Sequence, residues 1–142
     1  SMPHNIAQLA SLESTLFDAL EEAEDHGLGA EQGQSAFRRA MTALDNTISR
    51  RSELLYAPLS ADPLTRDYVS HLDGQILGLA ARIDVLRTHI ELALETGSEE
   101  IAALNASLNR LSRQLKVRFS RESALIPVYF SWRDRHPTAA SA

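Results

Sequence analysis

Charged residues interrupt the apolar stripes of several predicted helices, and at these positions the sequence could carry chemistry. Arg118 and Glu122 continue the stripe that leads up to Leu115, at steps of three and four residues. Arg51 and Glu13 occupy similar positions on the stripes of two earlier helices. Buried charges must be paired or hydrogen-bonded, because an unpaired one costs several kcal/mol. The pattern predicts a buried ion-pair network or a functional site.

A short phrase occurs twice in the chain, about seventy residues apart. The first copy is RSELLYAP at positions 51–58, and the second is RESALIP at positions 121–127. Each copy closes an apolar helical pattern just before a proline, which is a typical helix stop. The repetition therefore predicts two related helix hairpins.

Length and composition limit the classes of protein to consider. The 142 residues suit one domain, residues 1–142, and a chain of this size can bury a core without staples. The chain has no cysteine, which excludes disulfides, zinc–thiolate sites, iron–sulfur clusters and cysteine nucleophiles. We expect no membrane partner and a cytoplasmic protein, because no long apolar run and no signal-peptide pattern is present.

The net charge of −5 is unevenly distributed along the chain. Residues 1–32 carry seven acidic side chains and no Lys or Arg, whereas residues 110–135 carry seven basic and two acidic ones. Acidic runs and basic runs on helices are usually solvated faces. We therefore expect no nucleic-acid partner.

Periodic apolar residues predict an all-α protein with four long helices, at about residues 5–26, 35–56, 63–96 and 99–126. Between the first two, Gly27, Gly29 and Gly33 are expected to break the chain. Asp62 and Pro63 are a helix start, Gly97 is a helix stop, and Ser98 with its two glutamates is a predicted cap. Four such helices with short connections predict an up-down-up-down antiparallel four-helix bundle.

Two apolar features lie outside this pattern. Three of the chain's aromatic residues gather in the C-terminal segment 128–136, beyond Pro127, and we expect them to fold back onto the bundle rather than cover a partner. Leu77, Leu92 and Leu94 extend the apolar surface of the third helix beyond one seam. That surface would suit self-association as a homodimer.

The stretch from Leu44 to Leu79 resembles the hemerythrin-like (HHE) four-helix bundles. The similarity rests on Leu-Leu-Tyr-x-Pro at 54–58, on Asp62-Pro63-Leu64-Thr65-Arg66 and on His71. The second phrase, at 121–127, is similar to the closing segment of that family, and the resemblance covers about residues 5–130. It implies a bundle in which histidines and carboxylates of four helices hold a non-haem di-iron centre.

Most of those ligands are missing from this chain. The first helix has no histidine near the family's ligand position, the second has Thr47 and Arg51 in the His-x-x-x-Glu slot, and the fourth has Arg118 and Glu122. On the third helix His71 matches, but Gln75 follows it four residues later. Guanidinium groups in place of imidazoles repel a cation, so the resemblance implies a bundle that has lost its iron.

We expect the residues at these positions to form a vestigial site with a buried polar network: Glu13, Thr47, Arg51, His71, Gln75, Arg118 and Glu122. The expected function is a non-enzymatic binding, sensory or regulatory module with no cofactor, whose partner is an unknown protein or small ligand. No nucleophile elbow or phosphate loop is present, and no enzymatic activity is predicted. One alternative is an iron- or oxygen-binding protein with an atypical ligand set around His71 and Glu122. Another is a vacated centre that takes an anionic small molecule.

Overall fold

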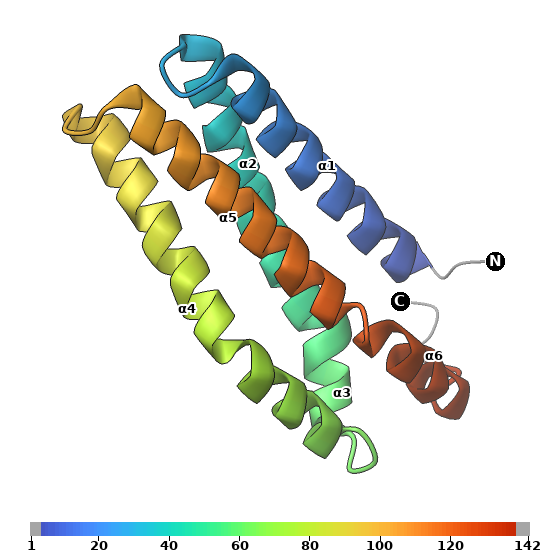
Figure 1. Cartoon of the computed structure of the whole chain (residues 1–142). Coiled ribbons are helices and arrows are strands. Elements are labelled where there is room, and N and C mark those ends of the chain that lie inside the picture. The colour runs from blue at the N-terminus through green and yellow to red at the C-terminus, as the bar shows by residue number, and fades with distance from the viewer. Residues whose placement is uncertain (1–3, 139–142) are drawn as a thin grey trace.

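A computed structural model of the chain describes residues 4–138, and every regular element in this range is helical. The elements are α1 (His4–His26), α2 (Glu31–Arg51), the π-helical turn η1 (Ser52–Tyr56), α3 (Ala57–Ala61), α4 (Arg66–Thr96), α5 (Ile101–Glu122) and α6 (Leu125–Arg135). The elements α2, η1 and α3 follow one another without a break and form one long helical segment. With α1, α4 and α5 they make four long helical segments that lie side by side (Figure 1). The prediction of an all-α helical bundle is confirmed.

The first helix has nearly the predicted bounds, but α2 begins at Glu31, four residues before the predicted start at 35. Gly33, predicted to break the chain, is instead buried inside α2. A Cβ atom on Gly33 would lie 1.7 Å from the carbonyl oxygen of Gly27, which ends α1 with φ +78°. The missing side chain of Gly33 therefore allows α2 to start directly against the end of α1.

The sequence predicts that the second helix stops at Tyr56, before Pro58, but the helical path continues past both residues. Pro58 lies in the first turn of α3, directly after the π-helical turn η1. A proline inside a regular α-helix loses a hydrogen bond and collides with the carbonyl group four residues earlier. The wider π turn precedes this point, and the path continues to Ala61.

The third long helix, α4, begins at Arg66 rather than at 63, because Asp62 first closes a turn. Its Oδ1 accepts a hydrogen bond from the backbone N–H of Leu64 at 3.1 Å, and its Oδ2 accepts one from Nη1 of Arg135 at 2.7 Å. Gly97 ends α4 with φ +66°, as predicted. The cap predicted at 98–100 is wrong, because no side chain within residues 4–138 caps α5.

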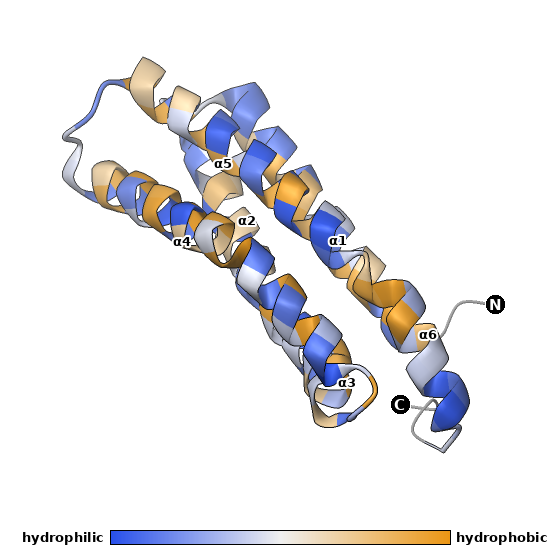
Figure 2. Cartoon of the chain, turned by 60° about the horizontal axis from the view of Figure 1, so that its bottom comes forward, coloured by the Kyte–Doolittle hydropathy of each residue, from blue (hydrophilic) through white to orange (hydrophobic). Residues whose placement is uncertain are grey.

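The C-terminal segment forms a helix of its own. The fourth long helix, α5, ends at Glu122, and after a short turn α6 runs through Pro127 to Arg135. Tyr129 of α6 is buried, and its hydroxyl accepts a hydrogen bond from the side-chain amide of Asn5 in α1. The first part of α6 is hydrophobic and its end is hydrophilic (Figure 2). The prediction that the aromatic residues fold back onto the bundle is therefore confirmed.

Two separate apolar clusters make up the interior. The larger one is built from α1, α2, α4 and α5 and includes Leu16, Leu44, Leu79 and Phe119. The smaller one packs the start of α1, α3 and α6 against the first turns of α4, and its members include Ile6, Leu9, Leu55, Leu59, Ile76, Leu125 and Tyr129. Along the sequence, Glu13, Arg51 and Glu122 each lie between a member of the larger cluster and a member of the smaller one.

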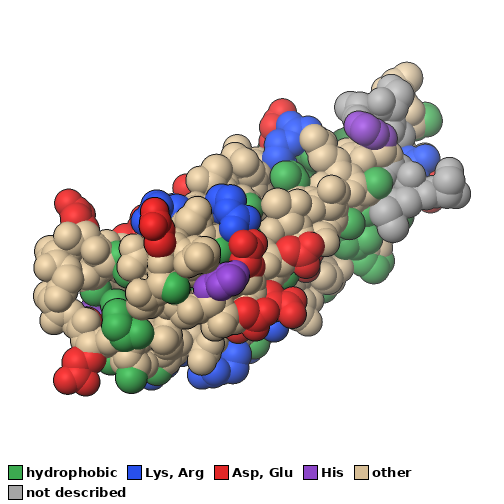
Figure 3. Space-filling model, turned by 90° about the horizontal axis from the view of Figure 1, so that it is seen from above, with side chains coloured by type: hydrophobic (Ala, Val, Ile, Leu, Met, Phe, Trp, Pro, Cys, Tyr) green, Lys and Arg blue, Asp and Glu red, His purple; other side chains and the backbone are tan. Residues whose placement is uncertain are grey.

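The surface mixes both signs of charge, and Figure 3 shows acidic and basic side chains interspersed on one face. A groove between α1 and α5 brings Asp18, Glu21 and Glu24 close to Lys116, so the acidic and basic stretches of the sequence are neighbours here. Leu77 and Leu92 are exposed on α4, whereas Leu94 packs against the core. Among residues 4–138, no helix has the length and apolar character needed to cross a membrane.

Candidate functional site

Five side chains, here called the central cluster, lie between the two apolar clusters: Glu13, Arg51, Tyr56, Arg118 and Glu122. Nη2 of Arg51 donates a hydrogen bond to Oε2 of Glu13 at 2.9 Å, which links α2 to α1. Nε of Arg118 donates to Oε1 of Glu122 at 3.0 Å, and the hydroxyl of Tyr56 donates to Oε2 of Glu122 at 2.5 Å. The four charged residues predicted to point inward thus form two separate ion pairs, one between α2 and α1 and one within α5, and Tyr56 of η1 adds a hydrogen bond to the second pair.

Arg51 is the last residue of α2, and only 5% of its side chain is exposed. Its guanidinium carbon lies 4.6 Å from the centre of the Phe119 ring, a cation–π contact. Within the part of the chain that the structure describes, its Nε and Nη1 are buried and have no hydrogen-bond partner. Arg51 therefore retains two unused donor groups in a buried position, which is unusual for a charged side chain.

Glu122 is the best-satisfied carboxylate of the central cluster. Its side chain is 2% exposed, and both of its oxygens accept hydrogen bonds, one from Arg118 and one from Tyr56. Burial raises the pKa of the Tyr56 hydroxyl, and the negative charge of Glu122 raises it further. Tyr56 therefore stays protonated and serves as a hydrogen-bond donor to the buried carboxylate.

Three of the predicted site residues lie outside the central cluster. Thr47 is buried, but its hydroxyl donates to the backbone carbonyl of Ala43 at 2.7 Å. His71 and Gln75 are exposed, and their side chains lie 3.2 Å apart on the outer face of α4. The prediction that His71 joins the buried network is wrong, because α4 turns the next residue, Leu72, toward the core, about 100° around the helix.

The central cluster borders a cavity of about 280 Å³, here called the central cavity. Arg51, Arg118 and Glu122 line it together with Asp73 of α4, and the hydroxyl groups of Ser52, Ser60 and Tyr56 add polar atoms. Two of these residues, Ser52 and Tyr56, belong to the π turn η1. Single π turns inside helices occur frequently at functional sites.

Sequence reasoning missed Tyr56 and Asp73 as site residues. Tyr56 belongs to the first copy of the repeated phrase, and Glu122 belongs to the second, so the two copies meet in a hydrogen bond. That repetition is a usable signal for Tyr56. Asp73 has no comparable signal, because it is an exposed residue in a helix with several other charged positions.

Asp73 carries an electrostatic cost that can be measured. Burial raises the pKa of its carboxyl group, and the negative charge of Glu122 raises it further. Because the pKa is higher in the folded chain than in the unfolded one, the ionised carboxylate destabilises the fold at neutral pH, and this cost vanishes below the ordinary value of 3.8. We expect Asp73→Asn to stabilise the protein by up to about 0.5 kcal/mol at pH 7, a small gain because solvent screens this exposed group.

Urea unfolding at several pH values checks this expectation for Asp73. The advantage of Asp73→Asn over the natural sequence should shrink as the pH falls from 7 toward 4. A variant that is less stable at pH 7, or an advantage that is independent of pH, would contradict the proximity of the two carboxylates.

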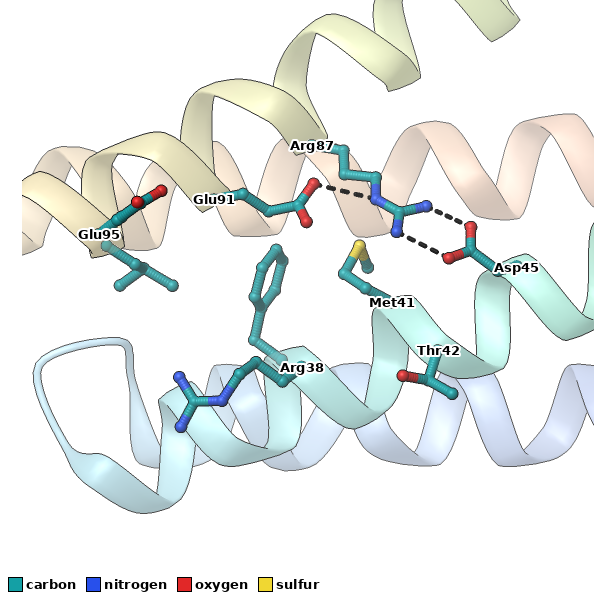
Figure 4. A pocket seen from close by; sticks show the side chains of 9 residues that line it. Arg38, Met41, Thr42, Asp45, Arg87, Glu91 and Glu95 are labelled. Carbon is teal, nitrogen blue, oxygen red and sulfur yellow. Dashed lines mark hydrogen bonds and ion pairs between the residues drawn. The ribbon is translucent and has the colours of Figure 1, made fainter.

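A second and larger cavity of about 510 Å³ opens between α2 and α4 (Figure 4). Phe37, Met41 and Leu94 supply its apolar lining. Arg87 of α4 makes two hydrogen bonds to the carboxylate of Asp45 in α2, at 2.5 and 2.9 Å, and one to Glu91 at 3.0 Å. Each nitrogen atom of the Arg87 guanidinium therefore donates a hydrogen bond. The bidentate ion pair between Arg87 and Asp45, here called the clip, links α4 to α2.

This clip predicts a pH dependence. The hydrogen bond from Arg87 lowers the pKa of the Asp45 carboxyl group, so the clip contributes stability above the ordinary pKa of 3.8, and this contribution is lost as the pH falls further. Asp45 is largely exposed, so Asp45→Asn should cost at most about 1 kcal/mol at neutral pH. Thermal unfolding of this variant beside Asp84→Asn, a change at an exposed aspartate of α4 outside both cavities, measures the difference. Equal melting temperatures would count against the clip.

The residues of the central cluster do not fit a di-iron centre. No group of three or more His, Asp and Glu side chains suited to a metal ion occurs among residues 4–138. The carboxylate oxygens of Glu122 already accept bonds from the guanidinium of Arg118 and the phenol of Tyr56, and a second guanidinium, that of Arg51, lines the same cavity. A cation at this position would meet fixed positive charge and too few donor atoms. Comparison with family models, curated proteins and solved structures found no match to this chain.

Proposed function

We propose that the chain is a hemerythrin-like bundle, with its helices in up-down-up-down antiparallel order, that has lost the di-iron site and acts as a non-enzymatic binding, sensory or regulatory module in the cytoplasm. The observation that carries the proposal is that two guanidinium groups, Arg51 and Arg118, line the central cavity together with Glu122, to which Arg118 is paired. This charge arrangement replaces the function of a metal: it compensates a buried carboxylate and ties three helices together.

The binding part of the proposal is supported by the cavities. The central cavity offers convergent polar groups, and the cavity between α2 and α4 offers a larger apolar wall. Ligand sites in helical bundles are formed by side chains on facing helices, as both of these cavities are. A module that binds a ligand between its helices can respond to that ligand by a change in helix packing.

The rival function, iron or oxygen binding around His71 and Glu122, has little support in the geometry. His71 is exposed and Glu122 is buried, and they lie on different helices. For both to bind one ion, α4 would have to rotate and bury His71 in place of Leu72. Such a rotation would expose part of the smaller apolar cluster.

An iron titration tests the proposed function. Protein purified without chelator is mixed anaerobically with Fe(II), and bound iron is measured after gel filtration, together with the visible spectrum after exposure to air. We expect iron far below one ion per chain and no oxo-bridge absorption. Stoichiometric iron with such absorption would overturn the proposal and favour the metal-binding alternative.

A further inference from the structure

We propose that two copies of the chain associate as a parallel homodimer through the outer face of α4, the side of this helix that points away from the core. This face is formed by residues that carry no charge, here called the outer stripe: Leu77, Ala81, Val85, Thr88 and Leu92. The inference goes beyond the proposed function, because it assigns a partner and an interface outside the central cavity. It does not depend on whether the bundle binds iron.

The outer stripe exposes large apolar side chains to solvent. Leu77, Val85 and Leu92 are 70%, 69% and 58% exposed, whereas α1 and α2 contribute no exposed large apolar side chain among residues 4–138. Steps of three or four residues keep the outer stripe within about 80° of the helix circumference, opposite the buried residues of α4. An α-helix that is apolar on two opposite sides is typically covered on both.

No element of the described part of the chain covers the outer stripe. In the bundle, α4 packs chiefly against α5 and α3, and it lies at an outer edge (Figure 1). One flank of α4 faces α2, since Arg87 and Glu91 line the cavity between these helices. The other flank borders α5 at Arg82 and Leu86. The outer stripe lies between the two flanks and is free to contact a second chain.

The two flanks carry opposite charges beside the middle of the outer stripe. On the α5 side, Arg82 of α4 and Arg110 of α5 line a cavity of about 300 Å³, which Ala81 and Val85 also border. Neither guanidinium has a hydrogen bond or ion pair with a described residue, and the same holds for Asp84 on the α2 side. Residues two apart on a helix do not face each other, so Arg82 and Asp84 of one chain do not form a pair.

A two-fold axis parallel to α4 brings the two flanks together. Rotation about this axis places the α2 flank of the second copy against the α5 flank of the first. Asp84 then lies at nearly the same height as Arg82 of the partner copy, because two residues differ by a rise of about 3 Å. Two equivalent sets of ion pairs form, each between Asp84 of one copy and the Arg82 and Arg110 side chains of the other.

The reverse, antiparallel arrangement is opposed by charge. It would bring Asp84 close to Asp84 of the second copy and Arg82 close to Arg82. Juxtaposed like charges disfavour an interface. Charge complementarity therefore selects a second copy of this chain in parallel orientation.

The size of the outer stripe sets the strength of the association. The distance from Leu77 to Leu92 along the helix is about 22 Å. One helix face of this length buries less than the ~1,200 Å² below which interfaces are weak and transient. We therefore expect a dissociation constant in the high micromolar range, so that dilute samples for unfolding contain the monomer.

Sedimentation equilibrium from micromolar to millimolar protein concentration measures the association. For the natural sequence we expect the mass of one chain at the lowest concentration, and an approach to the mass of two chains at the highest. Val85→Glu sets two like charges against each other in the middle of the interface, and it should raise the dissociation constant at least tenfold.

The matched control for Val85→Glu is Leu64→Glu. Leu64 is 75% exposed in the turn before α4, outside the outer stripe, so this variant gains the same charge and should associate like the natural sequence. Both substituted positions are exposed, and both variants should fold. A natural sequence that stays monomeric at millimolar concentration, or equal association of the two variants, would overturn the inference.

A charge exchange tests the ion pairs. Asp84→Arg should weaken the dimer about tenfold, since the new guanidinium meets Arg82 and Arg110 of the partner copy. Combination with Arg82→Asp should restore part of the loss, because opposite charges then face each other again. A double variant that associates no better than Asp84→Arg would contradict the pairing of the two flanks.

Single cysteines test the orientation, since the chain has no cysteine of its own. In a parallel dimer Leu92 lies beside Leu92 of the other copy, so Leu92→Cys should form a disulfide-linked dimer when oxygen is admitted. In an antiparallel dimer Leu92 lies near the opposite end of the partner's stripe. Leu64→Cys reports on random collisions and should link far less. Equal linking of the two variants, at a concentration where the natural sequence is dimeric, would overturn the parallel arrangement.

Discussion

Replacement of Glu122 by alanine should lower the free energy of unfolding by about 3–5 kcal/mol, because it leaves a partly buried cation without its partner. The side chain of Arg118 is only 15% exposed, and its Nε donates to Glu122. Without Glu122, Arg118 would lose its only ion pair among the described residues. Tyr56 would lose its hydrogen-bond acceptor at the same time. Natural domains are stable by only about 5–15 kcal/mol, so this loss would remove a large share of the total stability.

Urea unfolding followed by circular dichroism measures the loss at Glu122, with Glu95→Ala as the matched control. Glu95 is exposed on α4 and makes no hydrogen bond or ion pair with a described residue, so its removal should change stability by less than about 0.5 kcal/mol. Glu122→Gln should lie between the two, since the amide keeps an acceptor for one of the donors. Similar midpoints for Glu122→Ala and Glu95→Ala would show that the central cluster does not stabilise the fold.

Gly33→Ala should have an effect of similar size for a steric reason. The new methyl group would lie 1.7 Å from the carbonyl oxygen of Gly27, and a backbone atom cannot move aside as a flexible side chain can. The start of α2 would have to separate from the end of α1, where the larger apolar cluster is anchored by Leu28 and Phe37. Overpacking usually costs about 1–3 kcal/mol, and we expect at least the upper end of this range here.

Two other glycines provide the control for Gly33. A methyl group on Gly74, inside α4, would have no atom of the described residues within 4 Å, and one on Gly78 would meet only the end of the Arg82 side chain. Alanine at Gly74 should therefore stabilise the helix by about 0.5–1 kcal/mol. Thermal unfolding of Gly33→Ala and Gly74→Ala should shift the melting temperature in opposite directions. A Gly33→Ala variant as stable as the natural sequence would contradict the close contact of α1 and α2.

Much of the fold follows from local pattern, as the third long helix shows. Seven residues of its predicted apolar stripe are buried in α4, and Gly97 ends the helix in the left-handed conformation. Gly33 and Pro58 depart from their predicted roles for one shared reason. Each is a helix breaker by intrinsic preference, but the fold gives Gly33 a close helix contact and Pro58 a π turn that accommodates it.

The candidate site could be predicted only where a charged residue interrupts an apolar stripe. Arg51, Arg118 and Glu122 meet that condition, and the structure places all three beside the central cavity. His71 does not interrupt an apolar stripe, and its prediction rests on the family resemblance alone. In the structure its neighbour Leu72 occupies the buried position. Asp73 reaches the site from an exposed face of α4, and its proximity to Glu122 depends on a packing that links residues far apart in sequence.

A crystal structure of protein grown with Fe(II), with anomalous data collected at the iron edge, tests the central claim most directly. We predict no anomalous peak beside Glu122, with the Arg118 guanidinium on that carboxylate and Arg51 inside the bundle against Glu13 and Phe119. An iron peak bonded to Glu122, with either arginine turned out to solvent, would contradict the proposal that this bundle has lost its metal site.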